Sequence, residues 1–355
     1  QALAIKPDYA EVYYNMGVTL QKQDKLEEAV EAYKQALAIN PDYDEAWLNG
    51  AEAFENWNKL EQLEAWLEKA FQAFKIVPSD LRFMKAKLLW RNKKFIEASK
   101  LISHIDFETI TQSRKRDYLN LTAKCYEQNK DFDKAFKYFS KSNFLAKSSN
   151  DYAKYNPKIY FQALEDTLTK LKSRPLQTPI VHSLEKTGFN PVFLVGFPRS
   201  GTTLLDTILR SHSKIEVVEE QPTLIKAKLF LQKNGYDDLV TNIVSPNLLA
   251  EAKTVYKAEF NKYIERTHTG SVYLDKLPLN LLEAPLIHQL YPQAKFILAL
   301  RHPMDTILSC WMQNFKLNAA MANMVSLERV VEFYCVAMDT FKICRAKYNL
   351  SVHEI

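Results

Sequence analysis

The stretch from residue 191 to 209 constrains the fold of this chain more than any other, because three local patterns follow one another in it. Residues 192–195 form a short apolar run of the kind that makes a buried strand. A tight loop bounded by Gly196 and Gly201 comes next, and apolar residues then recur at helical spacing up to Leu209. Strand, loop and helix in this order predict a phosphate cradle, because backbone N–H groups and the helix dipole both favour an anion there.

The loop departs at one position from the nucleotide triphosphatase pattern, which is G-x-x-x-x-G-K-[ST]. Gly196 and Gly201 have the required spacing, but Thr202 stands where the lysine belongs. The cation nearest to the loop is Arg199. The loop can therefore hold a phosphate but lacks the lysine that reaches the β- and γ-phosphates, which disfavours an ATPase or a GTPase.

A repeat occupies the first half of the chain. Gln1-Ala-Leu-Ala-Ile-Lys-Pro-Asp-Tyr returns as Gln35-Ala-Leu-Ala-Ile-Asn-Pro-Asp-Tyr, 34 residues later, and Tyr13 and Trp47 keep the same offset. This period, with a large aromatic residue, small residues and a closing proline, is typical of tetratricopeptide repeats. We expect helix pairs without strands up to about residue 143, with degraded copies at 81–101 and 117–143.

Composition narrows the class of protein. A chain of 355 residues suits two domains. Its formal charge of +5 fits an anionic ligand but does not indicate nucleic acid. The four cysteines match no zinc or disulfide framework and favour a reducing compartment. No apolar run approaches the ~18 residues of a membrane span, and the first residues resemble a repeat already under way rather than a signal peptide. We expect neither a nucleic-acid nor a membrane partner.

Charged side chains end two of the predicted strands in the second half. Residues 215–218 suit a short strand that ends at Glu219 and Glu220, and Lys276 ends a second short strand that begins at residue 272. In a parallel sheet, ligands bind at the carboxyl ends of the strands. These acidic and basic side chains are therefore candidate site residues.

A third predicted strand, 296–300, ends at Arg301, and Pro303 can open the helix that carries Ser309. The guanidinium fork of an arginine pairs phosphate oxygens two at a time, and a hydroxyl adds a further donor. The pattern therefore indicates a second phosphate site, about 100 residues after the first loop. No cluster of residues with metal-ligand spacing is present, and no metal is expected.

These segments resemble those of sulfotransferases that use 3′-phosphoadenosine 5′-phosphosulfate (PAPS). Pro-Arg-Ser-Gly-Thr-Thr at 198–203 resembles the family's 5′-phosphosulfate loop, and the segment from Arg301 to Ser309 resembles its 3′-phosphate segment. In this family, which includes the tyrosylprotein sulfotransferases, a glutamate lies about 21 residues after the basic loop residue. Glu220 has that position here, but Glu219 stands where the family pattern has a glycine and remains the alternative. The segment from Asp275 resembles Asp-Lys-x-Pro-x-Asn of bacterial repeat-containing sulfotransferases.

The resemblance implies an activity and a set of site residues. The chain would transfer a sulfuryl group from PAPS to an acceptor hydroxyl, either of protein tyrosine, a glycan or a small molecule, without a metal. Glu220 would be the general base, and Arg199 and Lys276 would hold charge on the transferring group. The donor would be bound by the loop and by the second phosphate segment, through Arg199, Ser200, Gly201, Thr202, Thr203, Arg301 and Ser309.

The expected architecture is an α-helical tetratricopeptide repeat array followed by an α/β P-loop domain with a parallel sheet. The array would span 1–145, a helical linker 146–190 and a C-terminally incomplete PAPS-dependent sulfotransferase domain 191–355, in a cytoplasmic, bacterial protein. The concave face of the repeats would recruit a protein or peptide, or would only scaffold the enzyme. Two rival functions are a P-loop nucleotide kinase or NTPase and a catalytically inactive repeat scaffold.

Overall fold

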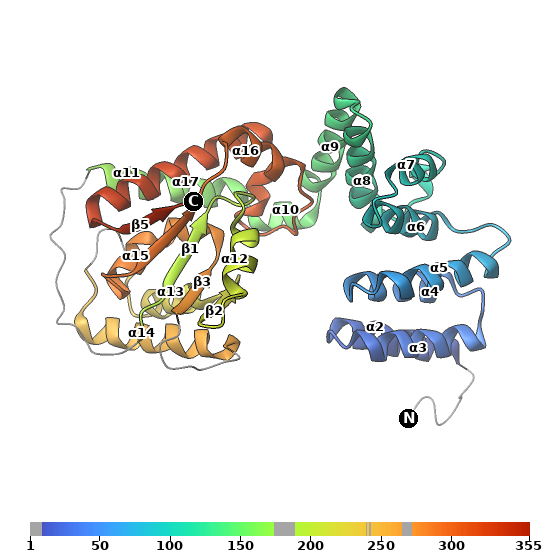
Figure 1. The fold of residues 1–355 in the computed structure, drawn as a ribbon, viewed down its shortest axis with the longest axis horizontal. Coiled ribbons are helices and arrows are strands. Elements are labelled where there is room, and N and C mark those ends of the chain that lie inside the picture. Colours follow the sequence, from blue (N-terminus) through green and yellow to red (C-terminus); the bar gives the residue numbers. More distant parts are fainter. Residues whose placement is uncertain (1–8, 174–188, 239, 241–242, 265–271) are drawn as a thin grey trace. The chain divides into compact units, whose positions relative to one another are not determined.

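The computed structural model describes residues 9–173, 189–238, 240, 243–264 and 272–355. The chain divides into two compact units, Gln1–Ala146 and Lys147–Ile355. Figure 1 shows the first unit as a series of helices and the second as a sheet with helices around it. Within the described residues, no helix is both long enough and apolar enough to cross a membrane.

The first unit is built from successive helices, and its described part, residues 9–146, contains no strand. The sequence-based prediction of a helical repeat array is thus confirmed. Two short 3-10 helices, Phe107–Thr109 and Gln112–Arg114, connect the third pair to the fourth. The helices are α2 (Ala10–Lys22), α3 (Leu26–Ile39), α4 (Asp44–Asn56), α5 (Leu60–Ala73), α6 (Ser79–Arg91), α7 (Phe95–Ser103), α8 (Lys115–Gln128) and α9 (Phe132–Lys147).

Close approach inside each of the first two pairs depends on a glycine. A Cβ atom on Gly17 of α2 would lie 2.5 Å from the ring of Tyr33 on α3. The indole of Trp66 on α5 likewise fills the space where Gly50 of α4 has no side chain. Each ring occupies the space that a glycine leaves open. The aromatic and small residues of the repeat pattern therefore allow the two helices of a pair to pack closely.

The turn inside every helix pair has the same backbone geometry. One residue in each turn adopts a left-handed conformation: Asp24 (φ 62°), Asn58 (φ 58°), Lys93 (φ 61°) and Lys130 (φ 61°). The N–H group of the next residue then donates to a carbonyl five residues earlier, as in Lys94 N to Leu89 O at 2.9 Å and Asp131 N to Tyr126 O at 3.0 Å. This is the hydrogen bond that closes a helix when a left-handed residue follows it. Among the residues described, the recurrence identifies four pairs, although the last two copies are degraded in sequence.

The second unit begins with α10 (Asn150–Tyr155) and α11 (Pro157–Ser173), which fall in the range expected to be a helical linker. Tyr160 of α11 packs edge-on against Phe333, with ring centroids 6.0 Å apart, and Arg329 lies over the ring of Phe161. Phe333 and Arg329 belong to α17 (Leu327–Tyr348), so α11 packs on this helix. Much of the expected linker, residues 174–188, lies outside the described residues, and the domain limits stay a prediction.

The sheet of the second unit has five parallel strands in the order β2-β3-β1-β4-β5. The predicted parallel α/β domain is thus confirmed. The strands are β1 (Val192–Gly196), β2 (Ile215–Glu219), β3 (Val272–Lys276), β4 (Lys295–Ala299) and β5 (Ser351–Glu354). The remaining helices are α12 (Thr202–Arg210), α13 (Thr223–Lys233), α14 (Pro246–Phe260), α15 (Ala284–Leu290) and α16 (Pro303–Met312), with short 3-10 turns at Asn261–Tyr263, Pro278–Glu283 and Met321–Val325.

Successive side chains of β1 point to opposite faces of the sheet and pack against different helices. Leu194 lies in one cluster with Leu205 and Leu209 of α12. On the other face, Phe193 packs with Tyr256 of α14 and with Phe296 of β4. Helices therefore cover both faces, as in Figure 1, and the open edge at the carboxyl ends of the strands is left for a ligand.

We expect Lys93→Gly to stabilise the repeat unit. A left-handed conformation costs an ordinary residue about 1–2 kcal/mol and costs glycine little, while glycine loses about 0.5–1 kcal/mol more on folding. The net gain should be about 0.5–1 kcal/mol, measured from the urea midpoint of the first unfolding transition. Lys94→Gly is the matched control, because Lys94 has φ −84°; a gain from that change as large as from Lys93→Gly would contradict the explanation.

Candidate functional site

Both glycines of the loop after β1 are required by its geometry. A Cβ atom on Gly196 would lie 2.5 Å from Ser200 Oγ and 2.8 Å from the carbonyl oxygen of Ala299. Gly201 has φ 102°, a conformation that L-residues rarely adopt. Arg199 also lies in the left-handed region, at φ 72°. Backbone strain at a loop of this kind is typical of functional sites.

The loop and the start of α12 fit an anion. The hydroxyl of Ser200 is buried and, within the part of the chain that the structure describes, has no hydrogen-bond partner. Thr202 and Thr203 open α12, where the first N–H groups have no partner within a helix. A buried donor beside free N–H groups at a helix N-terminus is suited to an anion such as a phosphate or sulfate.

The helix α16 brings a second predicted segment to this loop. Arg199 Nε donates a hydrogen bond to Ser309 Oγ at 3.1 Å, and the thiol of Cys310 donates to the carbonyl oxygen of Pro198 at 3.0 Å. The structure therefore brings together Arg199 of the first predicted phosphate segment and Ser309 of the second. Arg301 is half-exposed, and its Nε lies 3.7 Å from a carboxylate oxygen of Asp305.

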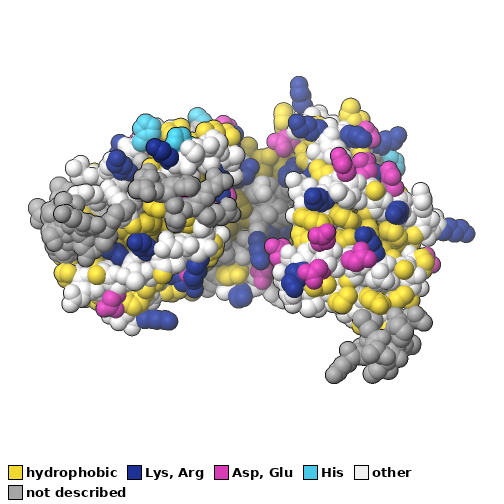
Figure 2. Space-filling model, turned by 60° about the horizontal axis from the view of Figure 1, so that its bottom comes forward, with side chains coloured by type: hydrophobic (Ala, Val, Ile, Leu, Met, Phe, Trp, Pro, Cys, Tyr) yellow, Lys and Arg dark blue, Asp and Glu magenta, His cyan; other side chains and the backbone are white. Residues whose placement is uncertain are grey.

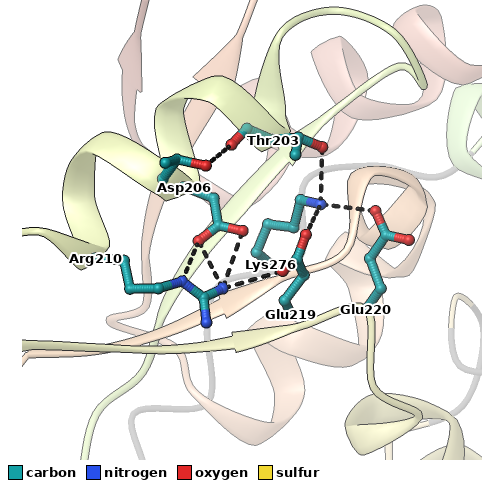
Figure 3. A network of polar contacts seen from close by, with 7 residues as sticks. Thr203, Asp206, Arg210, Glu219, Glu220 and Lys276 are labelled. Carbon is teal, nitrogen blue, oxygen red and sulfur yellow. Dashed lines mark hydrogen bonds and ion pairs between the residues drawn. The ribbon is translucent and has the colours of Figure 1, made fainter. Parts of the chain in front are cut away.

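A lysine at the end of β3 is the centre of a polar network, drawn in Figure 3. The side chain of Lys276 is fully buried, and its ammonium lies 3.2 Å from Thr203 Oγ1, 3.1 Å from Glu219 Oε1 and 2.7 Å from Glu220 Oε1. An ammonium has three donors, so each can have one of these acceptors. The structure thus brings together a loop residue, both candidate glutamates and the predicted lysine.

Glu219 has a second cation that the sequence analysis missed. Arg210 Nη2 donates to Glu219 Oε2 at 3.1 Å and to Asp206 Oδ1 at 2.9 Å (Figure 3). Asp206 and Arg210 lie four residues apart on α12, a spacing at which opposite charges meet on a helix, so the sequence did contain a signal for this pair. What it could not show was that the pair reaches the end of β2.

The cations of this network outweigh the effect of burial on the carboxyl pKa at Glu219 but not at Asp206. Burial raises the pKa of the Glu219 carboxyl, but Lys276 and Arg210 outweigh it, so this pKa lies below its usual value. At Asp206 burial dominates, and the pKa is raised although Arg210 opposes the shift. Glu219 is therefore a strongly held anion rather than a residue that only shapes the turn.

Glu220 differs from its neighbour in backbone and exposure. It has φ 52°, and its N–H donates to the carbonyl oxygen of Lys276 at 2.7 Å, which fixes its place beside β3. The side chain of Glu220 is 54% exposed, against 41% for Glu219. Among the residues described, Lys276 is the one cation within ion-pair distance of Glu220. Of the two carboxylates, Glu220 is the more open to an incoming group.

Asp275, next to Lys276, faces the opposite side of β3 and has a supporting role that the sequence analysis did not assign. It is fully buried and accepts hydrogen bonds from Thr223 Oγ1 at 2.6 Å and Tyr256 Oη at 2.7 Å. Burial raises the pKa of the Asp275 carboxyl to about 6, although these two hydrogen bonds lower it. The contacts tie β3 to α13 and α14 and so hold Lys276 in place.

In the described residues, no group of three or more histidine, cysteine, aspartate or glutamate side chains is arranged to hold a metal ion. The site that the geometry outlines consists instead of an anion-binding loop, a buried lysine and paired carboxylates. All of them lie at the carboxyl ends of β1, β2 and β3, the edge expected to bind a ligand.

Comparison with known proteins agrees with this geometry. Residues 191–353 match the model of the sulfotransferase family, and residues 10–43 match that of the tetratricopeptide repeat. The chain thus carries a sulfotransferase domain together with a tetratricopeptide repeat, as the sequence-based resemblance predicts.

Two curated relatives are similar over about half of this chain. An uncharacterized protein of Aquifex aeolicus (strain VF5) is 29% identical over 202 residues, which cover 54% of this chain and 25% of that protein. Protein-tyrosine sulfotransferase 1 of Danio rerio is 22% identical over 185 residues, which cover 51% of this chain and 46% of that protein. The chain therefore spans less than half the length of either relative. The similarity to the Danio rerio protein, together with the family match, supports a sulfotransferase.

A solved structure of YrrB, a TPR protein with an unusual peptide-binding site, is 16% identical with a TM-score of 0.28 and covers 41% of this chain and 90% of that one. Similarity at this level has no bearing on the site.

We expect the pKa of Asp275 to make stability fall as the pH rises. Its folded-state pKa of about 6 lies above the unfolded value of about 3.9, so the folded state binds more protons between about pH 4 and pH 6. Stability is therefore lost through this window, by on the order of 2–3 kcal/mol. The measurement is the free energy of unfolding of the wild type relative to Asp275→Asn at pH 4, 5, 6 and 7.

A difference between the wild type and Asp275→Asn that stays constant from pH 4 to pH 7 would show that Asp275 does not titrate in this window.

Proposed function

We propose that this chain transfers a sulfuryl group from PAPS to an acceptor hydroxyl. The observation that supports this function best is the buried Lys276, which lies between the anion-binding loop, at Thr203, and two carboxylates. A cation fixed there can stabilise negative charge that develops on a group bound at the loop. The match of residues 191–353 to the sulfotransferase family agrees with this chemistry.

We assign the donor to two places in the site. The hydroxyl of Ser200 and the N–H groups from Gly201 to Thr203, with the side chain of Arg199, would hold the phosphosulfate end, and Gly201 leaves open space there. Arg301 and Ser309 would hold the 3′-phosphate, the group that distinguishes PAPS from ordinary adenine nucleotides. The hydrogen bond from Arg199 to Ser309 supports this assignment, because it connects a residue assigned to the phosphosulfate end with one assigned to the 3′-phosphate.

We assign the role of general base to Glu220. Attack by the acceptor oxygen on sulfur needs removal of the hydroxyl proton, which Glu220 would accept. As the bond between sulfur and the bridging oxygen breaks, Lys276 and Arg199 would hold the charge left on the phosphate. PAPS supplies the sulfuryl group, and no metal enters this proposal.

The acceptor and the partner of the repeats belong to the same proposal. Protein tyrosine is one acceptor and a glycan hydroxyl another, and the repeats would recruit the acceptor or a partner protein on their concave face. The name of the Danio rerio relative favours tyrosine. We also propose a cytoplasmic, bacterial setting, and the four free thiols agree with a reducing cytoplasm.

A P-loop kinase or NTPase is the rival enzyme, and direct binding separates the two. Isothermal titration of the full chain should give heat with 3′-phosphoadenosine 5′-phosphate and little with ATP. A sulfate-transfer screen with PAPS over tyrosine peptides, glycans and phenols then tests turnover and excludes an inactive scaffold. Tighter binding of ATP would overturn the proposal.

We expect Glu220→Gln to lower turnover by on the order of 10²–10⁴-fold, the usual contribution of general-base catalysis. Glutamine keeps the size of the side chain and most of its hydrogen bonding, so binding of the donor should persist. The measurements are kcat with the best acceptor and the dissociation constant for 3′-phosphoadenosine 5′-phosphate.

Glu219→Gln is the matched control for this change. Because Glu219 holds Lys276 and Arg210 but is the less exposed carboxylate, we expect a smaller loss of turnover than for Glu220→Gln. A large loss for Glu219→Gln with a mild one for Glu220→Gln would identify Glu219 as the base. Full turnover in both variants would mean that another group accepts the proton.

We expect Arg301→Ala to weaken binding of 3′-phosphoadenosine 5′-phosphate by about 1.5–3 kcal/mol, the range for hydrogen bonds to charged groups. Affinity for adenosine 5′-phosphosulfate, which lacks the 3′-phosphate, should barely change. Lys295→Ala removes an exposed cation at the other end of β4 and serves as the control. Equal losses for both ligands would refute the assignment of Arg301.

A further inference from the structure

The repeat unit contains a groove of about 1320 Å³ that the proposed reaction does not use. Its walls come from α7 and α9, and its floor comes from α8 and the loop after α7. All of its lining residues lie between Ser99 and Leu145, inside the first unit. The two walls are the second helices of neighbouring helix pairs.

The floor of the groove is apolar. Ile102, Ile105, Leu119 and Cys125 line it and are each buried in the hydrophobic core of the unit. Tyr118 lines it too, and its hydroxyl oxygen lies 3.1 and 3.0 Å from the carbonyl oxygens of Ile102 and Ile105, which share its one proton. Because the polar end of Tyr118 is already paired, its ring adds apolar surface to the floor. Such a floor is suited to an aliphatic or aromatic side chain.

Both walls of the groove carry cations. Lys100 extends from α7, and Lys137 and Lys141 extend from α9; all three are exposed. In the part of the chain that the structure describes, none of the three has a carboxylate within ion-pair distance. The one acidic residue that lines the groove, Asp106, accepts a hydrogen bond from the N–H of Glu108 at 3.0 Å and caps a 3-10 turn. The positive charge of the rim is therefore not balanced inside the groove.

Aromatic rings lie beside these cations. Tyr126 of α8 and Tyr138 of α9 are stacked, with ring centroids 5.3 Å apart and planes at 18°. The ammonium of Lys141 lies 5.2 Å from the ring centroid of Tyr138. The two stacked rings connect α8 in the floor to α9 in the wall. The ring of Tyr138 provides a flat apolar surface beside the ammonium of Lys141. On the face that Figure 2 presents, Lys and Arg side chains lie among Asp and Glu side chains over the repeat unit.

We propose that this groove binds an acidic peptide segment. An aliphatic or aromatic side chain of the peptide enters the apolar floor, and flanking carboxylates pair with Lys100 on one wall and with Lys137 and Lys141 on the other. The cations on the two walls favour an anionic peptide. The apolar floor favours a peptide that also carries apolar side chains over one that is only charged. This site is independent of sulfuryl transfer, because no residue of the donor site takes part.

The binding test uses the full chain and a labelled probe. A fluorescein-labelled peptide in which glutamates alternate with leucine and phenylalanine should bind in a fluorescence anisotropy titration. Two control peptides carry lysine in place of glutamate, or serine in place of leucine and phenylalanine, and each should bind at least tenfold more weakly. Affinity for the acidic peptide should fall with added salt, because exposed charges are screened. Equal affinity for the three peptides would overturn the proposal.

Two variants test where the peptide lies. Lys137→Glu with Lys141→Glu should raise the dissociation constant at least tenfold. Lys69→Glu with Lys75→Glu is the matched control, because it changes the net charge equally at exposed lysines outside the groove. Ser103→Trp fills the groove from α7 without changing charge and should also weaken binding.

Thermal unfolding of each variant separates lost binding from lost structure. The location is wrong if the control pair weakens binding as much as the groove pair, or if a folded Ser103→Trp variant binds like the wild type. Because the assay contains no PAPS, its failure leaves the proposed transferase activity untouched, and loss of that activity would leave the groove proposal standing.

Discussion

The second unit depends on the burial of one positive charge. An ammonium taken out of water costs several kcal/mol unless it is paired and hydrogen-bonded. Lys276 meets this requirement with one acceptor from α12 and two from the end of β2. The same three contacts hold the anion-binding loop and both carboxylates around one point. The cost of burying Lys276 is thus offset by the groups that the proposed chemistry needs.

The order of the strands explains how these groups meet. In the order β2-β3-β1-β4-β5, β3 lies between β2 and β1, so the end of β3 is next to the glutamates on one side and to the loop on the other. The register pairs Glu219 directly with Lys276. Asp275 faces the other side of the same strand and binds to Thr223 and Tyr256. β3 therefore carries a charged side chain on each face. Lys276 is paired with residues of the candidate site, and Asp275 is hydrogen-bonded to residues of α13 and α14.

The repeat unit keeps its geometry although its sequence degenerates. The 34-residue period is evident only in the first copies, yet every turn inside a helix pair keeps its left-handed residue and its closing hydrogen bond. Lysine at two of these turns shows that the conformation is imposed by the packing of the helices rather than by the residue. Between α7 and α9, in the part of the array where the copies are degraded in sequence, the helices leave the groove with its cationic rim.

The sequence by itself determined what is local or periodic. Gly196 and Gly201 predicted the loop, the recurrence from Gln1 to Gln35 predicted the helix pairs, and the charged residues at strand ends predicted which edge of the sheet would matter. It also predicted that Glu219 and Glu220, Lys276 and the loop would converge. Only the tertiary structure decided how they pair: Glu219 is shared between Lys276 and Arg210, whereas Glu220 remains half-exposed. Such pairing depends on strand register and on side-chain directions set by residues far apart in the chain, and neither follows from spacing along the sequence.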